Sequence, residues 1–239
     1  MVSDVAAQWA SGSWKVIDTD MEPKIKVLIV DDERFFAEML KNTLSGESNI
    51  EVVGVAHDAR TALQMDELLD PDAVLMDIEL PGDMDGIEAA VQIKRAKPGT
   101  GIVILSAHNE RRYVTSLPLE NTSGWAYLLK QSVPDVSAVV RAIEGSINGM
   151  MVLDPAVVMN LQPRQGSAVS RLTKRQRQVL ELIAQGYNNA AIAEELILTE
   201  KSVETYINAI YQELGVSREH GIHSRVTATL AYLDDSQNL

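Results

Sequence analysis

The feature that most constrains this fold is the alternation of short apolar runs with amphipathic segments over residues 24–148. Five runs have strand length, and they are Ile25 to Val30, Val52 to Ala56, Ala73 to Met76, Ile102 to Leu105 and Ala126 to Leu129. Near-continuous apolar strands are typical of a parallel sheet buried on both faces. Helical periodicity follows each run, near residues 34–45, 58–69, 85–96, 108–117 and 134–148. This order predicts an α/β doubly wound five-stranded parallel sheet with right-handed crossovers.

The strand pattern stops after the fifth unit. Residues 149–170 contain Pro155, Pro163, Gly166 and several small polar residues, which predicts a linker with room for one helical turn. Residues 171–239 then show only helical periodicity. Its segments are 174–185, 189–196, 200–214 and 220–233. The second half is therefore predicted to be an all-α domain of four helices.

Residues 1–23 form an N-terminal extension before the first strand. They lack a basic start followed by an apolar run, so we expect no signal peptide. No stretch approaches the roughly 18 uninterrupted apolar residues of a membrane span, so no membrane contact is expected. The chain contains no cysteine, which excludes disulfides and cysteine-ligated zinc and suits a cytoplasmic protein.

The negative charge of the chain is concentrated in its first part. Residues 1–150 carry 24 acidic and 13 basic side chains, a net of −11, whereas residues 151–239 carry 10 and 8, a net of −2. This acidity argues against nonspecific polyanion binding by the whole chain. Any contact with nucleic acid is expected from the second half, on grounds of geometry.

Polar side chains directly follow four of the apolar runs. Asp31 and Asp32 follow the first run, Asp77 the third, Ser106 the fourth and Lys130 the fifth. The carboxyl ends of parallel strands lie side by side, so we expect these groups to share one pocket. A single Asp after a strand is more often a helix cap. Five suitable residues at the ends of these runs are harder to explain as caps.

The chemistry that suits this pocket is phosphoryl transfer to a carboxylate. Asp31, Asp32 and Asp77 offer hard oxygen ligands for one Mg²⁺. Such an ion would neutralise the clustered charge and polarise a phosphoryl group, with Asp77 as the nucleophile. Lys130 offers a cation to the phosphoryl oxygens, and the Ser106 hydroxyl offers a hydrogen bond.

Over about residues 24–148 the chain resembles the response-regulator receiver family. The matching segments are Leu-Ile-Val-Asp31-Asp32-Glu33, Leu-Met-Asp77-Ile-Glu-Leu-Pro81, Ile-Leu-Ser106-Ala107 and Tyr127-Leu-Leu-Lys130. The resemblance implies a flavodoxin-like fold with Asp77 as the phosphoacceptor. It also implies Mg²⁺ held by Asp31, Asp32, Asp77 and the backbone carbonyl of Glu79. Ser106 and Tyr127 are implied as a conformational switch that alters a partner surface.

Two features depart from the family pattern. The loop after Pro81, which reads Gly82-Asp83-Met84-Asp85-Gly86, is one residue longer than the usual form. Pro118 lies where the fourth helix should continue, and proline ends or kinks a helix. The switch surface is therefore expected to differ from the family norm more than the pocket does.

Helix-capping signals divide the second half. Thr173 with Gln176 predicts a capping box at the start of its first helix, and Gly186 is placed to end that helix. Thr199 can cap the third helix, whose buried stripe is predicted to be Val203, Ile207, Ile210 and Leu214. The opposite face holds Lys201, Thr205, Asn208 and Gln212. Such side chains can bind base edges, although an ordinary solvated helix could look the same.

Residues 171–232 resemble the LuxR-type helix-turn-helix. The matching segments are Leu-Thr-Lys-Arg-Gln-Arg-Gln-Val-Leu-Glu-Leu-Ile-Ala-Gln-Gly, Ala191-Ile-Ala-Glu-Glu-Leu, Lys201-Ser-Val-Glu-Thr-Tyr-Ile and Leu214-Gly215-Val216. The resemblance implies that Glu204, Thr205 and Asn208 face bases and that Lys201 and Ser202 contact phosphate. Glu204 is acidic where many relatives are basic, which lowers phosphate affinity but allows acceptance from a cytosine amino group. After Thr173, positive charge is confined to Lys174, Arg175, Arg177, Lys201, Arg218 and Arg225, so we expect weak binding by a monomer.

Together the two halves resemble the NarL/FixJ class of response regulators. The resemblance implies a DNA-binding transcription regulator, not an enzyme, with a cognate sensor histidine kinase and a double-stranded DNA operator as partners. Phosphorylation would release the DNA-binding domain, promote a homodimer, or do both, and a dimer would join two weak half-site contacts. Val226, Leu230 and Leu233 could form the dimer contact or belong to the domain core, with the core favoured.

Two other functions fit parts of the sequence. One is an aspartate-nucleophile phosphatase, whose usual motif places a second Asp two residues after the nucleophile, where this chain has Glu79. The other is a DNA-binding protein whose receiver acts without phosphorylation. Phosphate turnover would distinguish the first alternative, and unchanged DNA affinity after treatment with a phosphodonor would favour the second.

Overall fold

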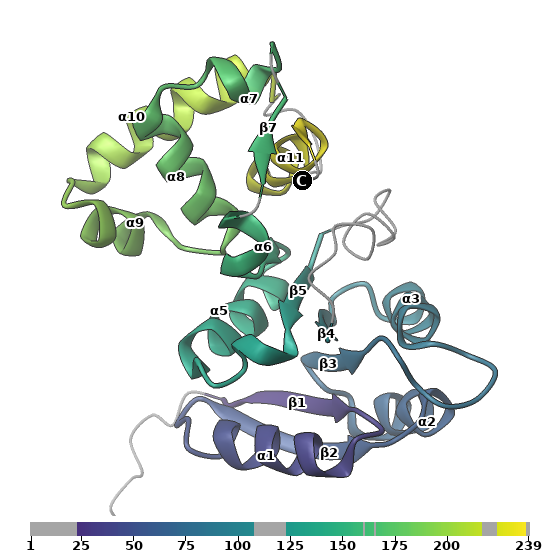
Figure 1. The fold of residues 1–239 in the computed structure, drawn as a ribbon. Coiled ribbons are helices and arrows are strands. Elements are labelled where there is room, and N and C mark those ends of the chain that lie inside the picture. The colour runs from purple at the N-terminus through teal and green to yellow at the C-terminus, as the bar shows by residue number, and fades with distance from the viewer. Residues whose placement is uncertain (1–22, 108–122, 160, 165, 217–223, 238–239) are drawn as a thin grey trace, which may run out of the picture.

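The computed structural model describes residues 23–107, 123–159, 161–164, 166–216 and 224–237 (Figure 1). The helix expected near residues 108–117 and Pro118 lie outside these ranges, as do residues 1–22 and Arg218. No helix in the described part is both long and apolar enough to cross a membrane.

The first part of the chain is a parallel sheet with the predicted strands. They are β1 (Ile25–Val30), β2 (Ile50–Ala56), β3 (Ala73–Asp77), β4 (Gly101–Ser106) and β5 (Trp125–Leu129). All lie parallel in the order β2-β1-β3-β4-β5, and β3, β4 and β5 are buried throughout. The continuous apolar runs reflect this two-sided burial. The doubly wound fold predicted from the sequence is confirmed.

Four described helices cover the two faces of the sheet. They are α1 (Arg34–Leu44), α2 (Ala59–Leu69), α3 (Gly86–Ala96) and α5 (Val136–Ile147). Leu40 of α1 and Ile143 of α5 belong to the core on one face, and Ala62 of α2 and Ile93 of α3 to the core on the other. A pocket opens at the carboxyl ends of the central strands, and the candidate site lies there.

A sixth strand, β6 (Met151–Leu153), lies parallel to β5 and extends the sheet beyond the five strands expected. The sequence predicted that these residues belong to a linker with room for one helical turn. That description was incomplete because three apolar residues are too few to show a strand period. The same segment also contains α6 (Pro155–Met159), β7 (Gln162–Pro163) and α7 (Ala168–Arg171).

The second half is helical, as predicted. Its helices are α8 (Lys174–Ala184), α9 (Asn189–Leu196), α10 (Glu200–Glu213) and α11 (Ser224–Asp234). The capping box of Thr173 with Gln176 is present, and Gly186 has the positive φ of 83° expected after a helix end. A short strand, β8 (Ser236–Gln237), pairs antiparallel with β7. Val226 and Leu233 are buried, which places these α11 positions in the domain core.

Candidate functional site

The carboxyl ends of the central strands form a pocket of about 480 Å³. Its lining residues are Asp32, Glu33, Asp77, Ile78, Glu79, Leu80, Pro81, Ser106, Ala107 and Lys130. β1 ends before Asp31, β3 ends at Asp77, and β4 ends at Ser106. Four of the predicted strand-end residues, Asp32, Asp77, Ser106 and Lys130, therefore share one pocket, and Asp31 contacts Lys130 from beside it.

Lys130 lies between two buried carboxylates. Its Nζ atom is 2.7 Å from Oδ2 of Asp31 and 2.9 Å from Oδ2 of Asp77. It also lies 4.8 Å from the centre of the Phe36 ring, a contact that the sequence did not predict. The Lys130 ammonium therefore contacts Asp31, Asp77 and the Phe36 ring at the edge of the pocket.

Burial dominates the electrostatics of this site. Asp31 is 0% exposed and Asp77 is 4% exposed. Burial raises the pKa of both carboxyls above its ordinary value, against the lowering effect of the nearby Lys130. Burial alone would lower the pKa of Lys130, but its hydrogen bonds to Asp31 and Asp77 outweigh that effect and raise the pKa. The apolar surroundings therefore disfavour two ionised carboxylates that only one ammonium neutralises.

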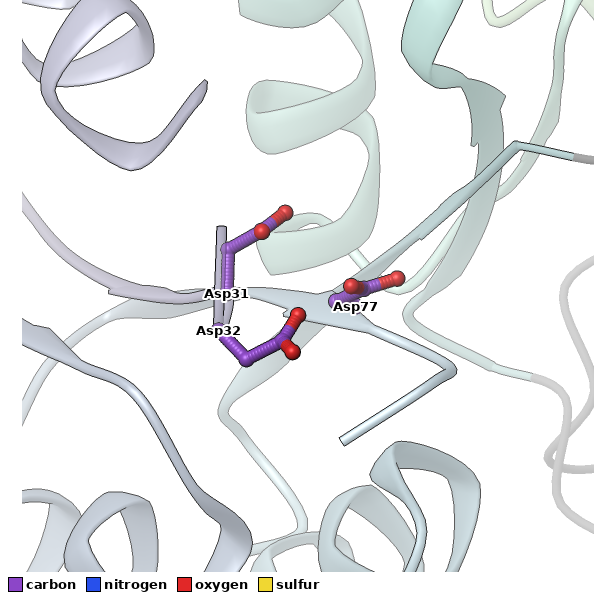
Figure 2. A group of neighbouring side chains, drawn as sticks. All are labelled: Asp31, Asp32 and Asp77. Carbon is purple, nitrogen blue, oxygen red and sulfur yellow. The ribbon is translucent and has the colours of Figure 1, made fainter. Parts of the chain in front are cut away.

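Three carboxylates are close enough to share one cation. Figure 2 shows Asp31, Asp32 and Asp77 gathered at the ends of β1 and β3, and each offers an oxygen within 4.8 Å of the others. When ionised they carry three negative charges beside the single positive charge of Lys130. Hard oxygen ligands with excess negative charge suit a divalent cation such as Mg²⁺. The residues present therefore fit such an ion.

The remaining residues predicted for the site are Ser106, Glu79 and Tyr127, and they do not all line the pocket. Ser106 lines the pocket, and the backbone N–H of Glu79 donates to Oδ1 of Asp77 at 3.4 Å. Tyr127 is instead 0% exposed within β5, paired with Ile104 of β4. Ser106 and Tyr127 thus lie on neighbouring strands, with only Ser106 in the pocket lining.

The loop after Pro81 positions the start of α3 against the pocket. Gly82 adopts a φ of +115°, which favours glycine. Asp85 and Glu88 form a reciprocal capping box that begins α3. The backbone of Gly86 passes so close to β3 that a Cβ atom there would lie 1.7 Å from the carbonyl oxygen of Asp77. The loop therefore ends with its backbone packed closely against that of Asp77.

The nucleic-acid face predicted on the third helix of the second half lies on α10. Val203, Ile207 and Ile210 are buried, as the periodicity predicted, whereas Leu214, the fourth residue of the predicted stripe, is only partly buried at the C-cap. The five candidate contact residues are solvent-accessible to different degrees. Lys201, Glu204, Thr205 and Asn208 are exposed, and Ser202 is half-buried. Figure 1 shows α10 on the side of the helical domain away from the sheet.

Some of the predicted basic residues have structural contacts instead. Arg175 donates to the carbonyl of Leu196, and Arg225 donates to the carbonyl of Tyr187 at 2.8 Å and to the side chain of Asn189. These guanidinium groups hold the helices of the domain together. Lys174 and Lys201 are exposed, which leaves them accessible to a polyanion.

Comparison with known proteins gives a match in each half. The receiver-domain model of response regulators matches residues 27–144, and the model of bacterial regulatory proteins of the luxR family matches residues 170–229. Both matches cover the segments on which the resemblances were based.

Individual relatives match this chain over about four fifths of its length. The chain is 31% identical to the transcriptional regulatory protein DegU of Brevibacillus brevis over 217 residues, which cover 82% of this chain and 90% of that protein. It is 32% identical to the probable transcriptional regulatory protein NarL of Mycobacterium tuberculosis, over 81% of this chain and 89% of that protein. A structure of the Salmonella typhimurium RcsB response regulator matches with a TM-score of 0.52 and 25% identity, over 89% of this chain and 99% of that one.

Proposed function

Because this chain belongs to the NarL/FixJ class of response regulators, which join a receiver domain to a LuxR-type DNA-binding domain, we propose that phosphorylation of Asp77 controls its binding to DNA. The chain is a two-component transcription regulator and not an enzyme, which removes the phosphatase alternative. The observation that supports the proposal best is Lys130 held between Asp77 and Asp31 at a cluster of three carboxylates.

Asp77 is the proposed nucleophile of a phosphoryl transfer. One of its carboxylate oxygens attacks the phosphorus of a phosphohistidine on a sensor histidine kinase. The phosphorus–nitrogen bond breaks, the electron pair returns to the histidine ring, and Asp77 becomes an acyl phosphate. Lys130 neutralises charge on the phosphoryl oxygens, and the Ser106 hydroxyl donates a hydrogen bond to one of them.

The acidic cluster is the proposed magnesium site. Asp31, Asp32, Asp77 and the backbone carbonyl of Glu79 would hold Mg²⁺, which supplies charge neutralisation to the incoming phosphoryl group. Bound Mg²⁺ would add the positive charge that Lys130 alone does not supply, which accounts for two buried carboxylates beside one ammonium. Ser106 and Tyr127 are the proposed switch between the two states of the receiver.

We assign the receiver domain to residues 24–148 and the DNA-binding domain to residues 171–239, with residues 149–170 as linker and 1–23 as extension. In the DNA-binding domain, Glu204, Thr205 and Asn208 are the proposed base contacts, and Lys201 and Ser202 the phosphate contacts. A double-stranded operator with two half-sites would then be bound by a homodimer. The exposure of these side chains on α10 supports this assignment.

The decisive experiment is the intact mass of the protein after treatment with acetyl phosphate and Mg²⁺. We expect the parent chain to gain one phosphoryl group, and Asp77→Ala to gain none. Asp83→Ala is the matched control, because Asp83 belongs to the adjoining loop but is exposed and pairs only loosely with Arg60 at 3.8 Å. An adduct that survives in Asp77→Ala would overturn the assignment.

A further inference from the structure

The linker continues the sheet of the receiver at the strand that leads to Lys130. β6 lies beyond β5, with Trp125, Ala126 and Tyr127 facing Met151, Val152 and Leu153. β5 would otherwise be the outermost strand on this side. The backbone that leaves the receiver is therefore hydrogen-bonded to the strand that carries Tyr127 and ends at the pocket.

Asp154, directly after β6, binds β5 and α6 simultaneously. Its backbone N–H donates to the carbonyl of Tyr127 at 2.8 Å, and its Oδ2 atom accepts from the N–H of Leu129 at 2.9 Å. Its Oδ1 atom accepts from the N–H of Ala156 at 2.7 Å, in the first turn of α6. The side chain is 0% exposed, so these contacts are made away from water.

The segment held by Asp154 packs directly on the DNA-binding domain. β6 contacts α8 and α11, and α6 contacts α8. Val152 of β6 lies against Gly186, so closely that a Cβ atom on that glycine would be 2.9 Å from the nearest Val152 carbon. Buried residues of β5, β6, α6, α8 and α11 belong to one continuous core.

We propose that Asp154 is the residue that couples the phosphorylation pocket to the DNA-binding domain. It fixes the end of β5 to the start of α6, so a movement of β5 is passed to α6 and to α8 behind it. The inference rests on the proposed function of Asp77. Lys130 keeps its own ion pairs with Asp31 and Asp77 when Asp154 is replaced. The variant should therefore still take up a phosphoryl group but lose the effect of phosphorylation on the DNA-binding domain.

The chain contains no cysteine, so introduced cysteines can be labelled specifically and the coupling can be measured in the full chain. Gln64 on α2 and Gln212 on α10 are both exposed, and replacing them with cysteine gives two specific sites for spin labels. The distance distribution between the labels is measured with Mg²⁺ alone and with Mg²⁺ and beryllofluoride, a mimic of the phosphoryl group. We expect the parent distribution to shift, and Asp154→Ala to lose about half of that shift or more.

Two controls separate coupling from general loss of structure. Asp58→Ala removes a comparable carboxylate cap, since Asp58 accepts from Thr61 N–H at 2.8 Å at the start of α2, and it should keep the full shift. Asp154→Asn preserves the shape but leaves one accepting oxygen for two donors, so it should show an intermediate shift and replaces Asp154→Ala if that variant does not fold.

The outcomes distinguish failure of the coupling role of Asp154 from failure of the proposed function of Asp77. A full shift in folded Asp154→Ala or in Asp154→Asn overturns the inference, as does an unchanged distribution in a parent chain that takes up phosphate from acetyl phosphate. An equal loss in Asp58→Ala also overturns it, because the effect would then follow from stability. Failure of the parent to take up phosphate overturns the proposed function itself.

Discussion

At the scale of single residues, the buried carboxyls of the pocket lower the stability of the folded chain when they are ionised. Asp31 and Asp77 are buried, and burial raises the pKa of each. A carboxyl whose pKa is higher in the folded than in the unfolded chain stabilises the fold most below the unfolded pKa. That stabilisation is lost as the pH rises through the folded pKa. Ionisation of Asp31 and Asp77 therefore opposes folding as the pH rises, whereas the raised pKa of Lys130 favours it.

Asp77→Asn should consequently stabilise the metal-free protein. The substitution removes one buried charge, and Lys130 retains its contact with Asp31 at 2.7 Å. We expect the free energy of unfolding in urea to rise by about 1 kcal/mol at pH 7, the usual size of the gain from a single stabilising substitution. The gain should shrink in acid, where the carboxyl of the parent is protonated. A loss of stability at pH 7, with the exposed control Asp83→Asn unchanged, would contradict this account.

At the scale of elements, the backbone at the start of α3 passes very close to the end of β3. A methyl group at Gly86 would meet the Asp77 backbone, which cannot give way as a side chain can. Gly86→Ala should therefore displace α3, lower the free energy of unfolding by about 1–3 kcal/mol and slow phosphoryl uptake at Asp77. Gly99→Ala is the matched control, because nothing lies within 4 Å of a Cβ atom there. Equal stability and uptake in the two variants would refute the contact as the cause.

The strands and helices differ in how well the sequence predicts them. Buried strands such as β4 are continuous apolar runs, and α8 has its capping box, so both follow from local patterns. β6 has only three residues, and its pairing with β5 depends on a non-local contact that no local pattern encodes.

Non-local contacts also limit how well the functional residues can be predicted from the sequence. Asp31, Asp77 and Lys130 could be predicted together because the ends of parallel strands converge. Asp154 before Pro155 carries a helix-cap signal, but its bond to Leu129 appears only in three dimensions. Similarly, no local pattern distinguishes Arg225, which holds helices together, from Lys201, which is exposed.

At the scale of the whole molecule, the two domains also touch through side chains. The guanidinium of Arg141 on α5 lies 4.5 Å from the centre of the Tyr187 ring, which follows α8. A cation over an aromatic face contributes about 0.5–1 kcal/mol when partly exposed. This contact links the receiver to the DNA-binding domain independently of the linker.

A double-mutant cycle measures that link. We expect Arg141→Ala and Tyr187→Ala to show an interaction energy of about 0.5–1 kcal/mol in the urea unfolding of the full chain. The comparison cycle uses Arg60 and Asp83, an exposed pair 3.8 Å apart that should give a value near zero. Strictly additive effects of the Arg141 and Tyr187 substitutions would show that the domains do not interact through this pair.

The pairing of β7 with β8 bears on how the protein can be dissected. Gln162 and Pro163 pair with Gln237 and Ser236, so the two ends of the DNA-binding half are fastened to each other. A fragment that starts at Leu172 would discard one side of this ribbon, and a receiver fragment that stops at Asn148 would discard β6. Truncation at either of these points therefore removes structure from the half that is kept, and the intact polypeptide is the proper unit for measuring either one.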